Sequence, residues 1–306
     1  MCANKQEVDA WFRLYEQILR DTGIMDEYGD VDGSRVWNVD ETGFSDVPDE
    51  VKVVSFKYMK PWRIVPHEHG TLSTVLTYVN AAGECLEPMV IHKGQRLNPE
   101  WSQFAHRGVE VRASDTGYIK GHLFDDYAQI FVKWLRDNGR LENGKKHVVL
   151  LDGHNSHIFN INFIEYMVQS GIEVLAIPAH TSHEIQPLDG APFANLKTKW
   201  FEALAGYYGR NYGKLLPKTI WFTVFNQAWY ATMNKRNIIA GFKMTGMVPV
   251  NRAKIPDKAL APSETTDNPD LAPGAAEDSE ASSDEESAPS ANNGTFVLPL
   301  KVFILS

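Results

Sequence analysis

Three aspartates occupy places where chemistry collects in a sheet covered by helices. Asp40 and Asp152 each close a short apolar run, and Asp189 opens a helical stretch soon after a further strand. A short apolar run that ends in turn residues is typical of a buried strand. In such sheets, ligands bind at the carboxyl ends of the strands. If the first two strands are neighbours, the carboxylates of Asp40 and Asp152 point at one place, and the helix can bring Asp189 over them.

Carboxylates that converge repel one another unless a cation lies between them. Hard oxygen ligands suit Mg²⁺ or Mn²⁺. Two such ions roughly 3.5–4 Å apart can activate a water or a 3′-hydroxyl and stabilise the leaving oxygen of a phosphodiester. The aspartates are therefore consistent with two-ion phosphoryl transfer on nucleic acid. By spacing alone, helix caps and turns are the commoner explanation for three scattered aspartates.

The periodicity of apolar residues predicts an α/β chain. Helices are expected at 6–21, 124–138, 158–170, 189–208, 219–233 and 237–244. Strands are expected at 35–40, 51–56, 71–80, 86–92, 146–152 and 172–177, and an irregular segment at 94–121. A helix, a meander of strands and then alternating helices and strands predict a mixed sheet with helices on both faces.

Composition narrows the class further. The formal net charge is -9, and residues 264–286 hold nine acids with no Lys or Arg, which leaves the remainder near neutral. This balance argues against a surface that coats nucleic acid broadly, but it permits a local basic groove. Two cysteines make a disulfide framework implausible. The apolar run at 295–306 is too short to span a bilayer, so no membrane is expected. The Pro-, Ser- and acid-rich tail 255–306 is expected to be disordered.

Local sequence around each aspartate resembles the DDE transposases of the pogo, Tigger and jerky branch. The motifs that carry the resemblance are WNVDETGF at 37–44, LDGHNSH at 151–157 and PAHTSHEIQPLD at 178–189. The stretches 80–94 and 242–251 are similar to the middle strands and the closing helix and turn of that family. The resemblance covers about residues 5–255 in the correct order. One departure is Pro192, and proline is tolerated at an early helical position.

The resemblance implies a function and a domain plan. It implies an RNase H-like, mixed five-stranded sheet, with Asp40, Asp152 and Asp189 as catalytic residues and ligands of two Mg²⁺ or Mn²⁺ ions. It also implies DNA strand cleavage and joining at transposon ends and target DNA, a nuclear location and a homodimer. The expected parts are a linker helix at 1–30, a catalytic domain at 31–254 and the tail. The family's helix-turn-helix reader domains would precede this chain.

Other residues could support these aspartates. Glu41, His154, His157 and His183 are expected to hold the carboxylates through hydrogen bonds or charge, although Glu41 should point to the opposite side of its strand. Glu184 is a fallback third acid. A zinc site of four histidines at 154, 157, 180 and 183 is a weaker alternative, because no cysteine accompanies them.

The residues expected to contact the DNA backbone are basic and lie mostly in the irregular segment: Lys93, Arg96, Arg107, Arg112, Lys120 and Lys197. An ordinary solvated loop explains them equally well. The alternative function is a domesticated, catalytically inactive DNA-binding or chromatin protein that kept the fold. Convergence of the three carboxylates and metal binding would separate the two functions.

Overall fold

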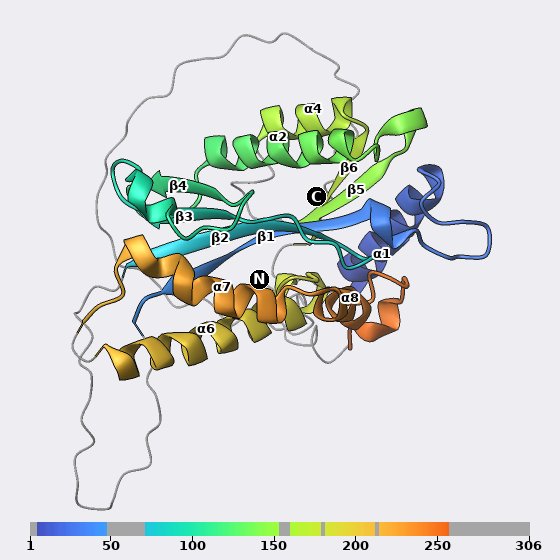
Figure 1. Cartoon of the computed structure of the whole chain (residues 1–306). Helices are drawn as coiled ribbons and strands as arrows, with labels where there is room; N and C mark the ends of the chain where they lie inside the picture. Colours follow the sequence, from blue (N-terminus) through green and yellow to red (C-terminus); the bar gives the residue numbers. More distant parts are fainter. Residues whose placement is uncertain (1–4, 48–70, 153–159, 179–180, 212–213, 257–306) are drawn as a thin grey trace, which may run out of the picture.

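A computed structural model of the chain describes residues 5–47, 71–152, 160–178, 181–211 and 214–256. The strands are β1 (Val36–Ser45), β2 (Leu72–Asn80), β3 (Met89–Lys93), β4 (Glu110–Ser114), β5 (His147–Leu151) and β6 (Ile172–Ala176). They form one six-stranded sheet in the order β4-β3-β2-β1-β5-β6. The described part of the chain therefore has one sheet at its centre, with β1 in an interior position (Figure 1).

The sheet is mixed. β2 is antiparallel to both β1 and β3, while the pairs β3–β4, β1–β5 and β5–β6 are parallel. Five strands thus run in one direction, and only β2 runs in the other. The edge of the sheet at which those five strands end is called the carboxyl edge below.

Helices cover both faces of the sheet. They are α1 (Lys5–Asp21), α2 (Gly121–Asp137), α4 (Ile161–Gln169), α5 (Ser182–Ile185), α6 (Ala191–Arg210), α7 (Trp221–Thr232) and α8 (Lys235–Met244). Single 3-10 turns lie at Gly33–Arg35, Pro99–Ser102, Glu142–Gly144, Lys218–Ile220 and Arg252–Lys254. In Figure 1, α2 and α4 lie on one face, and α6, α7 and α8 lie on the other.

Alternation along β1 assigns its residues to two cores. Trp37 and Val39 are buried in the core beneath α2 and α4, whereas Val36 and Phe44 belong to the larger core beneath α6, α7 and α8. Successive side chains of a strand point to opposite faces. Asn38 and Asp40 consequently face the α6–α8 side of the sheet.

Helix α1 packs into the larger core. Its apolar stripe is buried in the same cluster as α6 and α8. Trp11 Nε1 donates a hydrogen bond to the Ala176 carbonyl oxygen at 2.6 Å, and the Tyr15 hydroxyl donates to that of Met247 at 3.2 Å. The helix expected as a linker is thus fixed to the last strand of the sheet and to the turn after α8. The domain boundaries at 30 and 254 stay predictions.

The predicted α/β class with a mixed sheet flanked by helices is confirmed, but two details differ. The sheet has six strands rather than five, because β4 forms within the segment expected to be irregular. β4 has only five residues and, among the described strands, pairs with β3 alone, so its pairing defines it rather than a local pattern. Strand β1 continues to Ser45, so Asp40 lies inside the strand rather than at its end.

The remaining predictions concern two undescribed segments and the membrane. The strand expected at 51–56 and the tail from 257 onward lie outside the described residues. Within the described ranges, no helix is both long and apolar enough to cross a lipid bilayer.

Candidate active site

The pairing of β1 with β5 brings the first two aspartates together. Their parallel register sets Val36 opposite Val148 and Asn38 opposite Leu150. If that offset continued for two more residues along each chain, Asp40 would lie opposite Asp152, the residue that follows β5. Asp40 lies two residues after Asn38, and Asp152 lies two residues after Leu150. Strand alternation therefore directs both aspartates to the α6–α8 side. Neighbouring strands lie about 4.8 Å apart, so this continuation would bring the two aspartates to the same part of the carboxyl edge.

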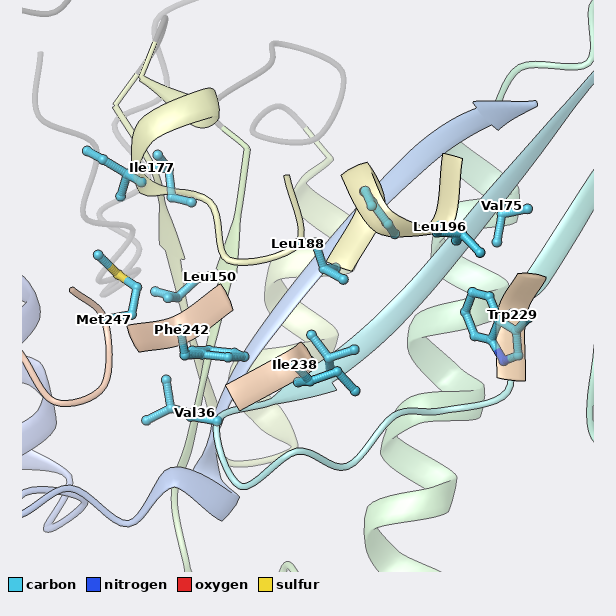
Figure 2. Close-up of a cluster of buried hydrophobic side chains, with 14 of the residues drawn as sticks. Val36, Val75, Leu150, Ile177, Leu188, Leu196, Trp229, Ile238, Phe242 and Met247 are labelled. Carbon is cyan, nitrogen blue, oxygen red and sulfur yellow. The ribbon is translucent and has the colours of Figure 1, made fainter. Parts of the chain in front are cut away.

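The third aspartate arrives on a turn between α5 and α6. Asp189 precedes Gly190, the N-cap residue of α6, so it stands two residues before the helix begins. The turn is held to β1 by a buried hydrogen bond from the Leu188 backbone N–H to Asn38 Oδ1, at 2.9 Å. The Leu188 side chain is fully buried in the larger core. Figure 2 shows it among side chains from β1, β5, α6 and α8.

The pKa shifts of the carboxyl groups show that these groups interact electrostatically. Burial raises the pKa of Asp40 well above its ordinary value, and the charges of Asp189 and Glu41 raise it further. Burial also raises the pKa of Asp189, with the charge of Asp152 adding to the effect. A side-chain hydrogen bond with Asp40 partly offsets that rise, as do Lys197 and His183. Asp40, Asp152 and Asp189 therefore lie within a single electrostatic cluster.

Glu41 belongs to the same cluster. Burial raises its pKa to about 7, and the charges of Asp152 and Asp189 contribute to the rise. The sequence prediction gave Glu41 a supporting role on the opposite side of the strand. The structure brings Glu41 close enough to interact with Asp152 and Asp189, and its charge also raises the pKa of Asp40, so four carboxyl groups share this part of the carboxyl edge.

The donor set fits a hard divalent cation. Asp40 is 8% exposed, and its Oδ2 atom has no hydrogen-bond partner among the described residues. Asp152 is half-buried and Asp189 is exposed, so the cluster opens toward solvent on the side of Asp189. Buried carboxylates that raise one another's pKa are stabilised when a cation lies between them. Within the described residues, however, no three potential ligands already stand in a coordinating arrangement.

Two of the other predicted residues lie beside the cluster. Lys197, on the first turns of α6, and His183, on α5, both lower the pKa of Asp189. His183 Nε2 lies 3.8 Å from Glu184 Oε1, and both side chains are at least partly exposed. His154, His157 and His180 lie outside the described residues, so the supporting roles of the first two and the four-histidine zinc site stay untested.

The basic residues expected to contact DNA are divided between two ends of the sheet. Lys93 ends β3 at the carboxyl edge, and Lys120 follows β4 at the same edge, paired with Asp115 at 2.8 Å. Arg96 is exposed in the loop after β3. Arg112 lies within β4 and pairs with Glu110 at 2.7 Å.

Arg107 lies elsewhere. Its neighbour His106 contacts Glu87, which precedes β3, so Arg107 is near the opposite edge of the sheet. The structure therefore brings Lys93, Lys120 and Lys197 to the carboxyl edge and does not bring Arg107 there.

Two buried amides at the site were missed by the sequence analysis. Asn38 bonds to both β5 and the turn that carries Asp189. Gln186 is 1% exposed, and its side chain lowers the pKa of Asp40. For Asn38, the signal available in the sequence was a polar residue inside an otherwise apolar strand, two positions before the acidic residue Asp40.

Gly241 was missed as well. This glycine of α8 faces the same turn, and a Cβ atom there would overlap the Pro187 carbonyl oxygen and come within 3.0 Å of Pro192 Cδ. The close approach of α8 to the turn thus depends on the absence of a side chain at position 241.

Comparison with known proteins agrees with this architecture. Residues 70–242, more than half of the chain, match the DDE superfamily endonuclease family. A protein of Cochliobolus lunatus described as MFS-type transporter clz9 is 26% identical over 223 residues, which are 70% of this chain and 23% of that protein. The chain therefore spans less than a quarter of this relative's length.

Among solved structures, a pre-cleavage Mos1 transpososome gives a TM-score of 0.52 at 11% identity, over 83% of this chain and 61% of the other. The mariner Mos1 paired end complex with Mg gives 0.49 at 13% identity, over 85% and 63%. The first of these structural likenesses supports an RNase H-like fold. The match to the family also shows to which family the chain belongs. The chain belongs to the DDE superfamily of endonucleases.

Proposed function

We propose that this chain is the catalytic part of a DDE transposase of the pogo, Tigger and jerky branch. It would cleave phosphodiester bonds in transposon-end DNA and join the released 3′-hydroxyl to target DNA. The observation that carries the proposal is the parallel register of β1 and β5, whose continuation would bring Asp152 beside Asp40, together with the Asn38–Leu188 bond, which holds the turn of Asp189 to β1. The motifs around each aspartate support the choice of branch.

Asp40, Asp152 and Asp189 would hold two Mg²⁺ or Mn²⁺ ions through their carboxylate oxygens. When bound, such ions lower the pKa of an attacking water or 3′-hydroxyl and neutralise charge on the phosphate and on the leaving oxygen. In cleavage, the water oxygen forms a bond to phosphorus as the bond to the 3′-oxygen breaks, and that oxygen leaves as a hydroxyl. In strand joining, a 3′-hydroxyl is the nucleophile and the displaced group is the 3′-oxygen of the target strand.

The residues of this chain would contribute position and charge. Asp40, the most buried of the three acids, stays fixed on β1, whereas the exposed Asp189 lies toward the incoming DNA. Lys197, close to Asp189, would contact a backbone phosphate, and Lys93 and Lys120 would extend that contact along the carboxyl edge. From the resemblance to this branch we further infer a nuclear location. We also infer action as a homodimer, because one reaction must join two transposon ends to the same target.

Nicking of supercoiled plasmid in Mn²⁺ tests this proposal on the whole chain. The parent chain is expected to convert the plasmid to open circles, with activity lost on adding a chelator. Asp40→Asn, Asp152→Asn and Asp189→Asn should each abolish nicking. Asp126→Asn, which removes an exposed acid of α2 on the other side of the sheet, should not. A folded parent that binds DNA but never nicks it would favour the inactive DNA-binding protein instead.

A further inference from the structure

Asn38 connects the three segments that carry the aspartates. Its side chain is fully buried near the start of β1. Nδ2 donates a hydrogen bond to the Leu150 carbonyl oxygen on β5 at 3.0 Å, and Oδ1 accepts one from the Leu188 backbone N–H at 2.9 Å. The partners are 112 and 150 residues away in sequence. One amide thus bonds to β5 and to the turn before α6 while its own backbone belongs to β1.

The chemistry of the partners fixes the orientation of this amide. A backbone carbonyl only accepts a hydrogen bond and a backbone N–H only donates one, so the side chain at position 38 must offer a donor on one side and an acceptor on the other. A leucine of similar size would meet neither requirement. A buried amide costs free energy unless it is hydrogen-bonded. A position that served packing alone, among neighbours such as Val36 and Leu150, would be better filled by an aliphatic residue.

Each of the bonded residues stands one or two positions from an aspartate. Asn38 is two residues before Asp40, and Leu150 is two residues before Asp152. Leu188 is adjacent to Asp189, and its carbonyl oxygen accepts a hydrogen bond from the Phe193 N–H at 2.9 Å, in the first turn of α6. With the Leu188 side chain buried in the core (Figure 2), the backbone on both sides of Asp189 is anchored.

We propose that Asn38 is a positioning residue, which holds the Asp189 turn at a fixed distance from Asp40 and Asp152 and so sets the cation affinity of the site. The proposal deepens the function given above and rests on it. The amide of Asn38 is bonded to protein backbone on both sides. It acts through Leu188, so its loss should loosen the turn before it affects the rest of the fold.

Asn80 supplies a matched control. It is fully buried, on β2, and its amide makes a comparable set of bonds: Nδ2 donates to Glu84 Oε2 at 2.6 Å and to the Ser34 carbonyl at 3.3 Å, and Oδ1 accepts from the Glu84 N–H at 2.9 Å. Asn80 is paired with Trp37, at the end of β1 away from the carboxyl edge. Its replacement should cost stability without reaching the carboxylates.

The experiment compares Asn38→Leu and Asn80→Leu with the parent in two measurements. The first is Mn²⁺ affinity by calorimetry. Removing a residue that orients a metal ligand typically weakens affinity by about 10–100-fold, and this loss is expected for Asn38→Leu alone. The second is backbone hydrogen exchange without metal, for the peptide that contains Leu188. Asn38→Leu should lose protection there, and Asn80→Leu should keep it, although both lower the melting temperature.

The two measurements separate the possible failures. Parental Mn²⁺ affinity and parental protection of Leu188 in a folded Asn38→Leu chain would overturn the positioning role. If the parent binds no Mn²⁺, the proposed function fails, and hydrogen exchange alone then decides whether Asn38 fixes the turn. Should Asn38→Leu not fold, Asn38→Ser replaces it, since a hydroxyl on a shorter side chain cannot reach both partners, and the same two results are required of it.

Discussion

Asp40 on β1 and Asp152, the residue after β5, each stand two positions beyond a pair that the parallel strands set opposite each other, Asn38 and Leu150. Their side chains face the same side because each stands two residues beyond the paired residues Asn38 and Leu150. The charge of Asp189 raises the pKa of Asp40, and the charge of Asp152 raises that of Asp189, because repulsion between like charges is unfavourable in a partly buried site. The fold therefore maintains a charge arrangement that is costly by itself and that a divalent cation would relieve.

Asp40→Asn should stabilise the metal-free protein while removing its response to metal. The raised pKa of Asp40 means that its ionised form opposes folding. The parent is thus most stable, with respect to this group, below the ordinary carboxyl pKa, and it loses that stability as the pH rises through the folded-state pKa. At pH 8 the variant should gain about 1–2 kcal/mol, and near pH 3 the two should be equal. Thermal unfolding with and without Mn²⁺ measures this; a variant that Mn²⁺ stabilises as much as the parent would contradict it.

Gly241→Ala should displace the turn that carries Asp189. The added methyl group would overlap the Pro187 carbonyl oxygen, which is backbone and cannot move aside cheaply. Overpacking of this kind costs about 1–3 kcal/mol. Gly206→Ala on α6 is the control, since the nearest atom to its Cβ is a flexible Arg210 nitrogen at 3.7 Å, and it should gain roughly 0.5–1 kcal/mol. Chemical denaturation of both variants tests the difference, and equal stabilities would refute it.

His147 should make stability depend on pH at the start of β5. Its Nδ1 accepts a hydrogen bond from Trp37 Nε1 at 3.1 Å, and Nε2 donates to the Arg140 carbonyl at 3.0 Å, so the neutral ring is the one that fits. Burial lowers its pKa, and the positive charges of Arg35 and Arg140 lower it further, whereas the negative charge of Asp32 raises it. The neutral ring's contribution is therefore complete above the ordinary histidine pKa near 6.5 and is lost as the pH falls below it.

Urea unfolding at several pH values checks this assignment. His147→Gln should flatten the decline in stability between pH 6.5 and 5, whereas His122→Gln, at an exposed position of α2, should leave it unchanged. A decline of the same steepness in the His147 variant and the parent would rule out this source.

Trp11→Ala should destabilise the whole described unit rather than an appended helix. Trp11 is 2% exposed and bonds to the end of β6, so its removal leaves a cavity in the larger core. The expected cost is about 3–5 kcal/mol. Gln17→Ala, on the exposed side of α1, should change stability by less than about 0.5 kcal/mol. A second, separate unfolding transition in the Trp11 variant would show instead that α1 is independent of the sheet.

The sequence predicted the parts of the fold whose signals are local. The apolar runs around residues 148–151 and 172–176 and the amphipathic face of α1 contain their own evidence, and the structure has these elements. β4 escaped prediction because its five residues alternate weakly and depend on pairing with β3. The end of β1 was placed too early because Glu41 and Gly43 resemble a turn, whereas pairing with β2 extends the strand to Ser45.

The candidate site, like the fold, could be predicted from the sequence only in part. The three aspartates were accessible from their motifs, but their meeting depends on the β1–β5 register, which no single segment specifies. Asn38 and Gly241 act through contacts with residues far away in sequence, with Leu188 and Pro187 respectively. A buried amide and a helical glycine have no local pattern that reveals such partners, so only the assembled sheet identifies their role.

Asp40, Asp152 and Asp189 are expected to form one site for a divalent cation. Titration of Mn²⁺ into the whole chain by calorimetry, beside Asp40→Asn, Asp152→Asn, Asp189→Asn and the control Asp126→Asn, tests it most directly. Saturable binding is expected in the parent and in the control, and its loss is expected in each of the other three variants. Absence of binding by the folded parent, or binding that persists in all three variants, would contradict it.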